Sequence, residues 1–274
     1  MKPLLALLSL TYVLVAADPP KGEPTNAKEA AAQVAAKKAA QDKVVDEKYQ
    51  AWVAKLSPEA QAWEKVLQSQ LGNFYLPLHK RDKVAGKSNA WDFVLDDPKL
   101  PRVLLIGDSV SRGYTQPTRV ALAGKSNVHR APANCGPTAS GLKNLDVWLG
   151  AGKWDVIHFN FGIHDRATPA ADYVKRLEEI VARLEKTGAK LIWASTTPIP
   201  DNPAQKQTAQ SVVDKNALAA EVMKKHGIPT DDLFGAMTPR LKEFQPPLDV
   251  HYTGAGYDFL GAKVGESVLA VLAR

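Results

Sequence analysis

The chain has 274 residues and only one cysteine, Cys135. A single cysteine cannot form an intrachain disulfide even in an oxidising compartment, so the stability of the fold has to come from a packed core. Hydrophobic residues make up 45% of the sequence, which is enough for a sizeable core in a chain of this length. Internal repeats are absent as well, which excludes a repeat architecture.

The sequence also lacks the pattern typical of nucleic-acid binding, a run of basic residues interleaved with stacking aromatics. The formal net charge of +6 is spread over predicted helical faces, where acidic residues lie between the lysines. No nucleic-acid partner is therefore expected.

Metal and cofactor sites have little support. His158, His164 and Asp165 offer too few ligands, at unsuitable spacing, for a catalytic zinc ion. A glycine cluster at residues 254–261 resembles a dinucleotide-binding loop only faintly, and because it follows no long strand a helix cap explains it better. We expect no metal and no cofactor.

The first residues have the features of a targeting segment. Lys2 supplies a positive start, residues 4–15 form an apolar run, and residues 15–17, Val-Ala-Ala, resemble a small-residue cleavage site. We expect residues 1–17 to be a signal peptide and the protein to be secreted or periplasmic. The alternative, an uncleaved membrane anchor, is disfavoured because the apolar run is too short for stable membrane insertion.

Residues 18–100 are predicted to form a linker and a helical extension that packs on the main domain. Residues 18–26 are rich in Pro, Gly and polar residues, and residues 27–55 are rich in Ala, Lys, Gln and Glu, which favour a helix. Ser57, followed by Pro-Glu, predicts the cap of a second helix. Aromatic residues lie among turn-forming residues between 72 and 101, and we interpret them as cover for a hydrophobic sheet edge rather than as a carbohydrate site.

From residue 101 onward, apolar strand-like runs alternate with amphipathic helical stretches, a pattern typical of a parallel sheet with helices on both faces. The predicted strands are residues 103–106, 128–131, 156–161, 190–195 and 228–230, and the predicted helices include 142–149, 170–186, 207–226 and 256–272. We therefore predict one α/β domain over residues 101–274, with a central parallel sheet of about five strands.

Ser109 lies at the end of the first predicted strand, within a Gly-Asp-Ser sequence. The simplest interpretation is a helix cap, because Asp and Ser side chains accept hydrogen bonds from free backbone N–H groups. However, the loops at residues 133–138, 162–165 and 249–253 should lie at the same sheet edge, where open α/β sheets bind their ligands. Their convergence favours a reactive site.

These loops carry the residue types that nucleophilic ester chemistry needs. A serine hydroxyl is a weak nucleophile until a base takes its proton, and a histidine on a late loop, oriented by a carboxylate, can do so. Backbone N–H groups and a side-chain donor then have to hold the oxyanion, each contributing about 3 to 4 kcal/mol. Gly136 suits this role because glycine lets a substrate approach closely. Cys135 is the alternative nucleophile, but a lone cysteine after a strand is more typical of a buried packing residue.

The sequence GDSVS, the later Gly136, the sequence GIHD and the terminal DVHYT resemble the four motif blocks of the SGNH or GDSL hydrolase superfamily, in the same order. The resemblance covers about residues 101–274. It implies a flavodoxin-like three-layer sandwich and a metal-independent serine esterase, with Ser109 as the nucleophile and His251 as the base. It also implies that the backbone N–H groups of Ser109 and Gly136 form part of the oxyanion hole.

Two positions depart from the pattern of the superfamily. The third block usually carries an asparagine as oxyanion donor, whereas this chain has His164, whose neutral imidazole can still donate one hydrogen bond. Asn134 and Asn160 are alternative donors, although Asn160 lies within a strand, where a structural partner is expected. The acid normally stands three residues before the histidine, where this chain has Leu248. Either Asp249 orients the histidine ring, or the enzyme works as a dyad with a backbone carbonyl in that place.

These observations predict a serine esterase that hydrolyses carboxylic esters through an acyl-serine intermediate. A short acyl group, such as an acetyl ester on a carbohydrate, is favoured because the sequence has no obvious apolar lid for a long acyl chain. The expected partner is therefore a small-molecule or polysaccharide ester. The alternative function is a non-catalytic glycan-binding module, in which the departures at positions 164 and 248 have removed catalysis.

Overall fold

A computed structural model describes residues 23–274 of the chain, with side chains from Lys28 onward. The predicted signal peptide at residues 1–17 lies outside the described residues. Within the described part of the chain, no helix is both long and apolar enough to cross a membrane.

The centre of the fold is a five-stranded sheet in which all neighbouring strands are parallel. Its strands, in the spatial order β2-β1-β3-β4-β5, are β1 (Arg102–Ile106), β2 (Asn127–Arg130), β3 (Val156–Phe159), β4 (Lys190–Ala194) and β5 (Thr230–Asp231). The predicted α/β fold with about five parallel strands is confirmed. Because β1 lies between β2 and β3, the connections turn to opposite sides at the end of β1, and such a switch point is where these sheets bind ligands.

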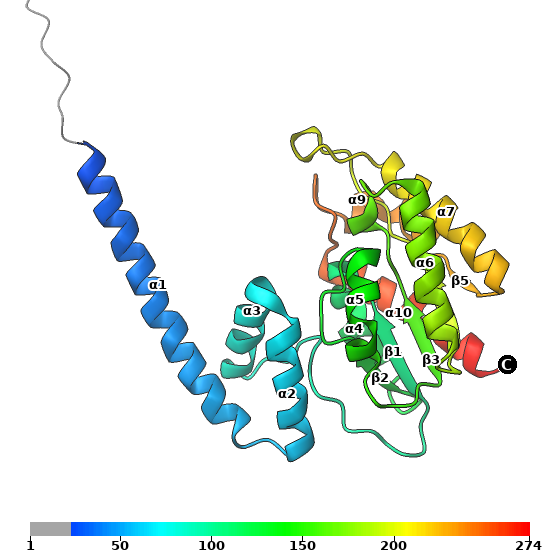
Figure 1. Cartoon of the computed structure of the whole chain (residues 1–274), viewed down its shortest axis with the longest axis horizontal. Coiled ribbons are helices and arrows are strands. Elements are labelled where there is room, and N and C mark those ends of the chain that lie inside the picture. Colours follow the sequence, from blue (N-terminus) through cyan, green and yellow to red (C-terminus); the bar gives the residue numbers. More distant parts are fainter. Residues whose placement is uncertain (1–22) are drawn as a thin grey trace, which may run out of the picture. The chain divides into compact units, whose positions relative to one another are not determined.

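Helices cover both faces of the sheet, which makes three layers (Figure 1). One face carries α4 (Ser109–Ala121) and α10 (Gly254–Leu272), and the other carries α5 (Thr138–Leu149), α6 (Ala170–Glu185) and α7 (Gln210–His226). Alternate side chains of β1 divide between the two cores: Val103 and Leu105 pack under α4 and α10, whereas Leu104 and Ile106 pack under α5, α6 and α7. All four are apolar because both faces are covered.

The chain divides into two compact units after Glu47, and helices α2 (Pro58–Gln70) and α3 (Gly72–Val84) belong to the same unit as the sheet. Helix α1 (Glu23–Val53) begins inside the predicted linker rather than after it. The predicted cap of α2 is present, since Oγ of Ser57 accepts the N–H of Ala60 at 3.3 Å. The domain boundary near residue 100 remains a prediction.

Helix α3 contradicts the expectation of an irregular segment after residue 72. Pro77 lies inside this helix, where it removes one backbone hydrogen bond. Contacts from other segments outweigh that loss: Tyr75 packs edge-on against the buried Trp91 at a centroid distance of 5.4 Å, and the buried His79 lies 2.8 Å from the carboxylate of Glu64. Hydrophobic periodicity does not reveal contacts of this kind.

The sequence predictions also omit several short elements. These are the 3-10 helices η1 (Ile163–Asp165), η2 (Pro203–Gln205) and η3 (Thr238–Arg240), and the helices α8 (Leu233–Met237) and α9 (Leu241–Phe244). Each is too short for a helical period to be detected. Among them, η1 matters most for function because it carries His164.

His226, at the end of α7, bridges to α6. Its two ring nitrogens lie 2.8 Å from the carboxylate of Glu178 and 2.9 Å from that of Glu185. The hydrogen bond with Glu178 raises the pKa of His226, and Glu185 adds to the effect. The imidazolium form therefore stabilises the contact between the two helices.

We expect His226→Gln to lower the free energy of unfolding by about 0.5 to 1 kcal/mol at about pH 5, and by less at about pH 9. Because the pKa is raised in the folded state, the contribution is complete below the ordinary pKa of histidine and is lost as the pH rises through the folded-state value. Urea unfolding at both pH values measures the difference. A matched control is Lys263→Gln, which removes an exposed ion pair with Glu266 that involves no histidine. An equal loss for His226→Gln at both pH values would contradict this account.

Candidate active site

Ser109 is the first residue of α4 and follows the turn that ends β1. The carboxylate of Asp108 accepts hydrogen bonds from the N–H groups of Val110 and Ser111, so Asp108 forms the helix cap and Ser109 does not. Gly107 is needed in this turn because a Cβ there would lie 2.7 Å from the Cβ of Ser111. The hydroxyl of Ser109 is thereby left available for another partner.

His251 is that partner. Its Nε2 lies 2.9 Å from Oγ of Ser109, and its Nδ1 lies 2.7 Å from Oδ1 of Asp249. The same carboxylate oxygen accepts the backbone N–H of His251 at 3.0 Å. This backbone hydrogen bond is the main cause of the lowered pKa of Asp249, and the imidazole adds to it. The three residues predicted to be catalytic therefore lie in one hydrogen-bonded chain that ends in an ionised carboxylate.

Leu248 stands where the resemblance leads us to expect the acid. Its side chain is 61% exposed, and its backbone has a φ of 60°, in the left-handed region that is uncommon for leucine. The carboxylate of Asp249 instead turns back to the N–H two residues later, a turn that Asp residues commonly form. That turn brings the carboxylate to the imidazole, so Asp249, and not a backbone carbonyl, lies beside the ring.

The loop that carries Gly136 lies against the turn between β1 and α4, because the N–H of Cys135 donates to the carbonyl of Gly107 at 3.1 Å. Gly136 has a φ of 66°, a conformation that favours glycine. The buried Oδ1 of Asn134 has no hydrogen-bond partner. Cys135 itself is buried, and burial raises the pKa of its thiol to about 12, so it acts as a packing residue rather than as a nucleophile.

A cleft of about 430 Å³ opens beside Ser109 and His251. His164 lines the cleft with an exposed side chain, whereas Gly136 and Asn134 are not among the lining residues. The other lining residues are Phe74, Tyr75, Leu78, Arg112, Ile163, Arg166, Gln205, Gln207 and Val250. The third-block histidine thus faces the space in which a substrate would bind.

The aromatic residues that we interpreted as cover for a sheet edge fall into two groups, one buried and one on the cleft. Trp91 is buried and packs with Leu67 and Leu71. Phe74 and Tyr75, in contrast, line the cleft beside the serine. Helix α3 therefore contributes apolar surface to the candidate active site, which the sequence did not indicate.

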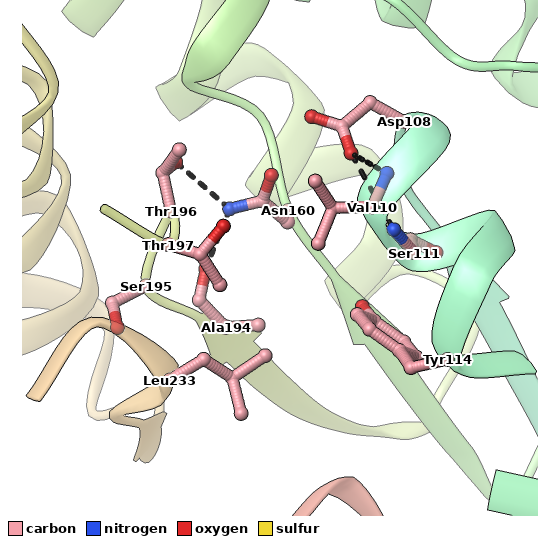
Figure 2. A pocket seen from close by; sticks show the side chains of 10 residues that line it. All are labelled: Asp108, Val110, Ser111, Tyr114, Asn160, Ala194, Ser195, Thr196, Thr197 and Leu233. Carbon is pink, nitrogen blue, oxygen red and sulfur yellow. Dashed lines mark hydrogen bonds between the residues drawn. The ribbon is translucent and has the colours of Figure 1, made fainter. Parts of the chain in front are cut away.

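Asn160 does not line the cleft, and its side chain forms hydrogen bonds at and just after the end of β4. Figure 2 shows its side chain directed toward Thr196 near the carboxyl ends of β3 and β4. Its Nδ2 donates to the carbonyl of Ala194 at 2.7 Å and to Oγ1 of Thr196 at 3.0 Å. The cavity drawn there has a volume of about 10 Å³, too small for a substrate. Asn160 therefore has structural partners, as its position in the chain predicts.

Arg130 holds the turn between β1 and α4, which consists of Gly107 and Asp108. This arginine was not identified from the sequence. This residue ends β2 and is 2% exposed. Its Nη2 donates to the carbonyls of Gly107 at 3.0 Å and Asp108 at 2.9 Å, and its Nη1 donates to the hydroxyl of Ser111. No motif marks an arginine at the end of a short strand, so only the folded structure identifies this role.

Asp165, which follows His164, is fully buried and caps a helix from another loop. Its two carboxylate oxygens accept hydrogen bonds from the N–H and Oγ1 of Thr138, each at 2.7 Å. Thr138 begins α5, and Pro137 before it has no side-chain donor or acceptor, so Asp165 satisfies an otherwise free N–H of that helix. The contact fixes η1, and with it the position of His164.

The three residues weighed as metal ligands do not come together. His158 is buried within β3, where its Nε2 lies 2.9 Å from the carboxylate of Asp231, while His164 is exposed on the cleft. Among the residues that the structure describes, no group of three His, Cys, Asp or Glu side chains is arranged to hold a metal ion.

Comparison with known proteins points to the same part of the chain. The model of a family described as the GDSL-like lipase/acylhydrolase family matches residues 105–259. The match begins within β1 and ends within α10, so it includes the serine, the histidine and the carboxylate. A search of curated protein sequences finds no match.

Solved structures share the fold at low sequence identity. A lipase/acylhydrolase from Enterococcus faecalis aligns with a TM-score of 0.57 and 22% identity, over 62% of this chain and 96% of that chain. An acetylxylan esterase from Geobacillus stearothermophilus aligns with a TM-score of 0.53 and 15% identity, over 61% of this chain and 94% of that chain. A GDSL-like lipase from Bacteroides thetaiotaomicron aligns with a TM-score of 0.52 and 16% identity, over 70% of this chain and 97% of that chain. These likenesses confirm the predicted three-layer fold.

We expect Arg130→Met to lower the free energy of unfolding by about 1.5 to 3 kcal/mol, because the buried carbonyls of Gly107 and Asp108 each lose a charged donor and keep only one backbone N–H. Ester hydrolysis should fall in kcat with little change in KM, since the turn that presents Ser109 loses its support. Chemical unfolding and steady-state kinetics measure both effects. As a control, Arg176→Gln removes a half-exposed arginine on α6 and should change neither. Full activity and full stability of Arg130→Met would contradict the assignment.

Proposed function

The chain belongs to the GDSL-like lipase/acylhydrolase family and is a hydrolase of ester bonds, and from that premise we propose that it cleaves carboxylic esters through an acyl intermediate on Ser109. One observation carries the proposal: the hydroxyl of Ser109, the imidazole of His251 and the carboxylate of Asp249 form a continuous hydrogen-bonded chain at the edge of a cleft. A complete chain of this kind favours catalysis over a glycan-binding module without activity.

In the proposed reaction, Nε2 of His251 takes the proton of Ser109 as Oγ attacks the carbonyl carbon of the ester. Asp249 stabilises the imidazolium and holds its Nδ1–H in place. The protonated histidine then donates the proton to the leaving alcohol, and water, activated by the same imidazole, hydrolyses the acyl-serine. The ester is thereby converted to an acid and an alcohol.

Three donors are proposed for the oxyanion. The backbone N–H groups of Ser109 and Gly136 occupy the turn and the loop that are tied together by the hydrogen bond between Cys135 and Gly107. His164 lies on the same cleft and is proposed to donate its single N–H in place of the usual asparagine. Asn134, whose side-chain Nδ2 carries two N–H donors, is the alternative donor.

The proposed substrate is a short-chain ester, such as an acetyl group on a carbohydrate. Support comes from the cleft, which is open and has polar and apolar lining rather than a deep apolar tunnel. Similar structures include an acetylxylan esterase, although at 15% identity it supports this substrate only by analogy. Secretion or periplasmic export, predicted from residues 1–17, is consistent with an extracytoplasmic polysaccharide.

A fluorophosphonate ester and a chromogenic acetyl ester test the nucleophile together. We expect the probe to modify Ser109, identified by peptide mass spectrometry, and Ser109→Ala to lose both labelling and at least about 10³-fold of the activity. Ser69→Ala is the matched control, since Ser69 is exposed on α2 and does not line the cleft. Equal hydrolysis by the wild type and Ser109→Ala would exclude Ser109 as the nucleophile.

Asp249→Asn should lower kcat by about 10²- to 10⁴-fold, because an amide can neither fix the same tautomer nor stabilise the imidazolium. The variant should still fold, since this side chain is half exposed and its removal leaves the core intact. Kinetics on the acetyl ester and the thermal unfolding midpoint measure the two effects. An unchanged kcat would favour a serine–histidine dyad.

A further inference from the structure

Two arginine side chains in the cleft have no part in the proposed chemistry. We infer that Arg112 and Arg166 form an anion-binding subsite beside Ser109, and that the natural ester carries an anionic group, a carboxylate such as that of an acidic sugar. This inference rests on the proposed function, because it concerns the substrate of the same site.

The cleft is cationic on one side. Arg112 follows Ser109 by three residues on α4, and Arg166 directly follows η1, so the two guanidinium groups reach the cleft from different segments. None of the residues that line the cleft is an aspartate or a glutamate. Between residues 28 and 274, no carboxylate lies within ion-pair distance of either guanidinium.

Arg112 is held in place by aromatic rings rather than by an acid. Its guanidinium carbon lies 5.5 Å from the centre of the Tyr75 ring and 6.0 Å from that of Trp91. Its Nε is buried without a hydrogen-bond acceptor. The arginine is therefore already oriented, and part of its hydrogen-bonding capacity is unused.

Arg166 is held by a backbone carbonyl rather than by an acid. One Nη1 hydrogen bond, to the carbonyl of Ile163 at 2.7 Å, fixes the side chain to the loop of His164. Burial lowers the pKa of Arg166, and the negative charge of Asp108 opposes the shift. Asp108 acts on Arg166 from beyond ion-pair distance, so the guanidinium is partly desolvated and has no carboxylate in direct contact.

A partly desolvated cation without a counter-charge costs free energy, and a ligand anion offsets that cost. Guanidinium groups suit a carboxylate particularly well, because two N–H donors in one plane match its two oxygens. An acetyl group contains no ionisable function, so the anion has to belong to the alcohol part of the ester. Phe74, which is 71% exposed on the same cleft, offers an apolar surface for the rest of a sugar ring.

The test compares two substrates, the acetylated methyl glycosides of glucuronic acid and of glucose. We expect kcat/KM of the wild type to be at least about tenfold higher for the glucuronic acid ester, and this ratio to fall to about one in Arg112→Gln and in Arg166→Gln. Arg176→Gln, which changes an arginine outside the cleft, should keep the ratio of the wild type. Thermal unfolding of each variant verifies that it is folded.

The outcomes separate the subsite from the proposed reaction. Hydrolysis of both esters by the wild type at equal kcat/KM would overturn the anionic substrate and leave the esterase intact. Hydrolysis of neither ester would contradict the esterase, and calorimetric titration of the wild type with free glucuronate and with glucose would still test the subsite, which requires glucuronate to bind more tightly. A stronger preference for acetylated glucose 6-sulfate than for the glucuronic acid ester would overturn the choice of a carboxylate.

Discussion

A buried guanidinium that donates to two carbonyls of one turn is the interaction on which the site depends. Arg130 donates to the carbonyls of Gly107 and Asp108, where the chain passes from the sheet into the helix. The carbonyl of Gly107 also accepts the N–H of Cys135. One turn thus fixes both the start of α4, where the serine stands, and the loop of the proposed oxyanion glycine. Without the guanidinium, each carbonyl would keep one backbone donor, from Cys135 or Arg112, but the buried turn would lose its link to β2.

The proposed base and acid are held in place in a different way. His251 and Asp249 come from one short loop, and both side chains are more than one third exposed. Their relative position is set by hydrogen bonds within the loop rather than by burial. The loop in turn is held by Tyr252, whose hydroxyl donates to the carbonyl of Pro198 at 2.9 Å, and by the N–H of Thr253, which donates to the carbonyl of Phe244 at 2.8 Å. A mobile acid would orient the imidazole poorly, and these contacts restrict it.

The sequence was most informative where one local pattern determines the structure. The apolar run of β1 and the glycine and serine after it predicted where the strand ends and the next helix begins, because strand period and turn chemistry are local. The residues that hold the site were not predictable in this way. Arg130, Asp165 and the helix α3 depend on partners 15 or more positions away in the chain, and no periodicity encodes such a pairing. For the same reason, the carboxylate partners of His79 and His226 were not foreseen.

Helix α3 contributes to the cleft although it lies outside the region that the family model matches. The family match begins at residue 105, yet Phe74, Tyr75 and Leu78 lie on the surface that a substrate would meet. A fragment trimmed to the matched region would keep the reacting atoms and lose part of what surrounds the ester. Part of the surface around the ester therefore lies on a segment separate from the reacting atoms, so changes in the helices before residue 105 offer evolution a way to adjust the preferred substrate without altering the reacting residues.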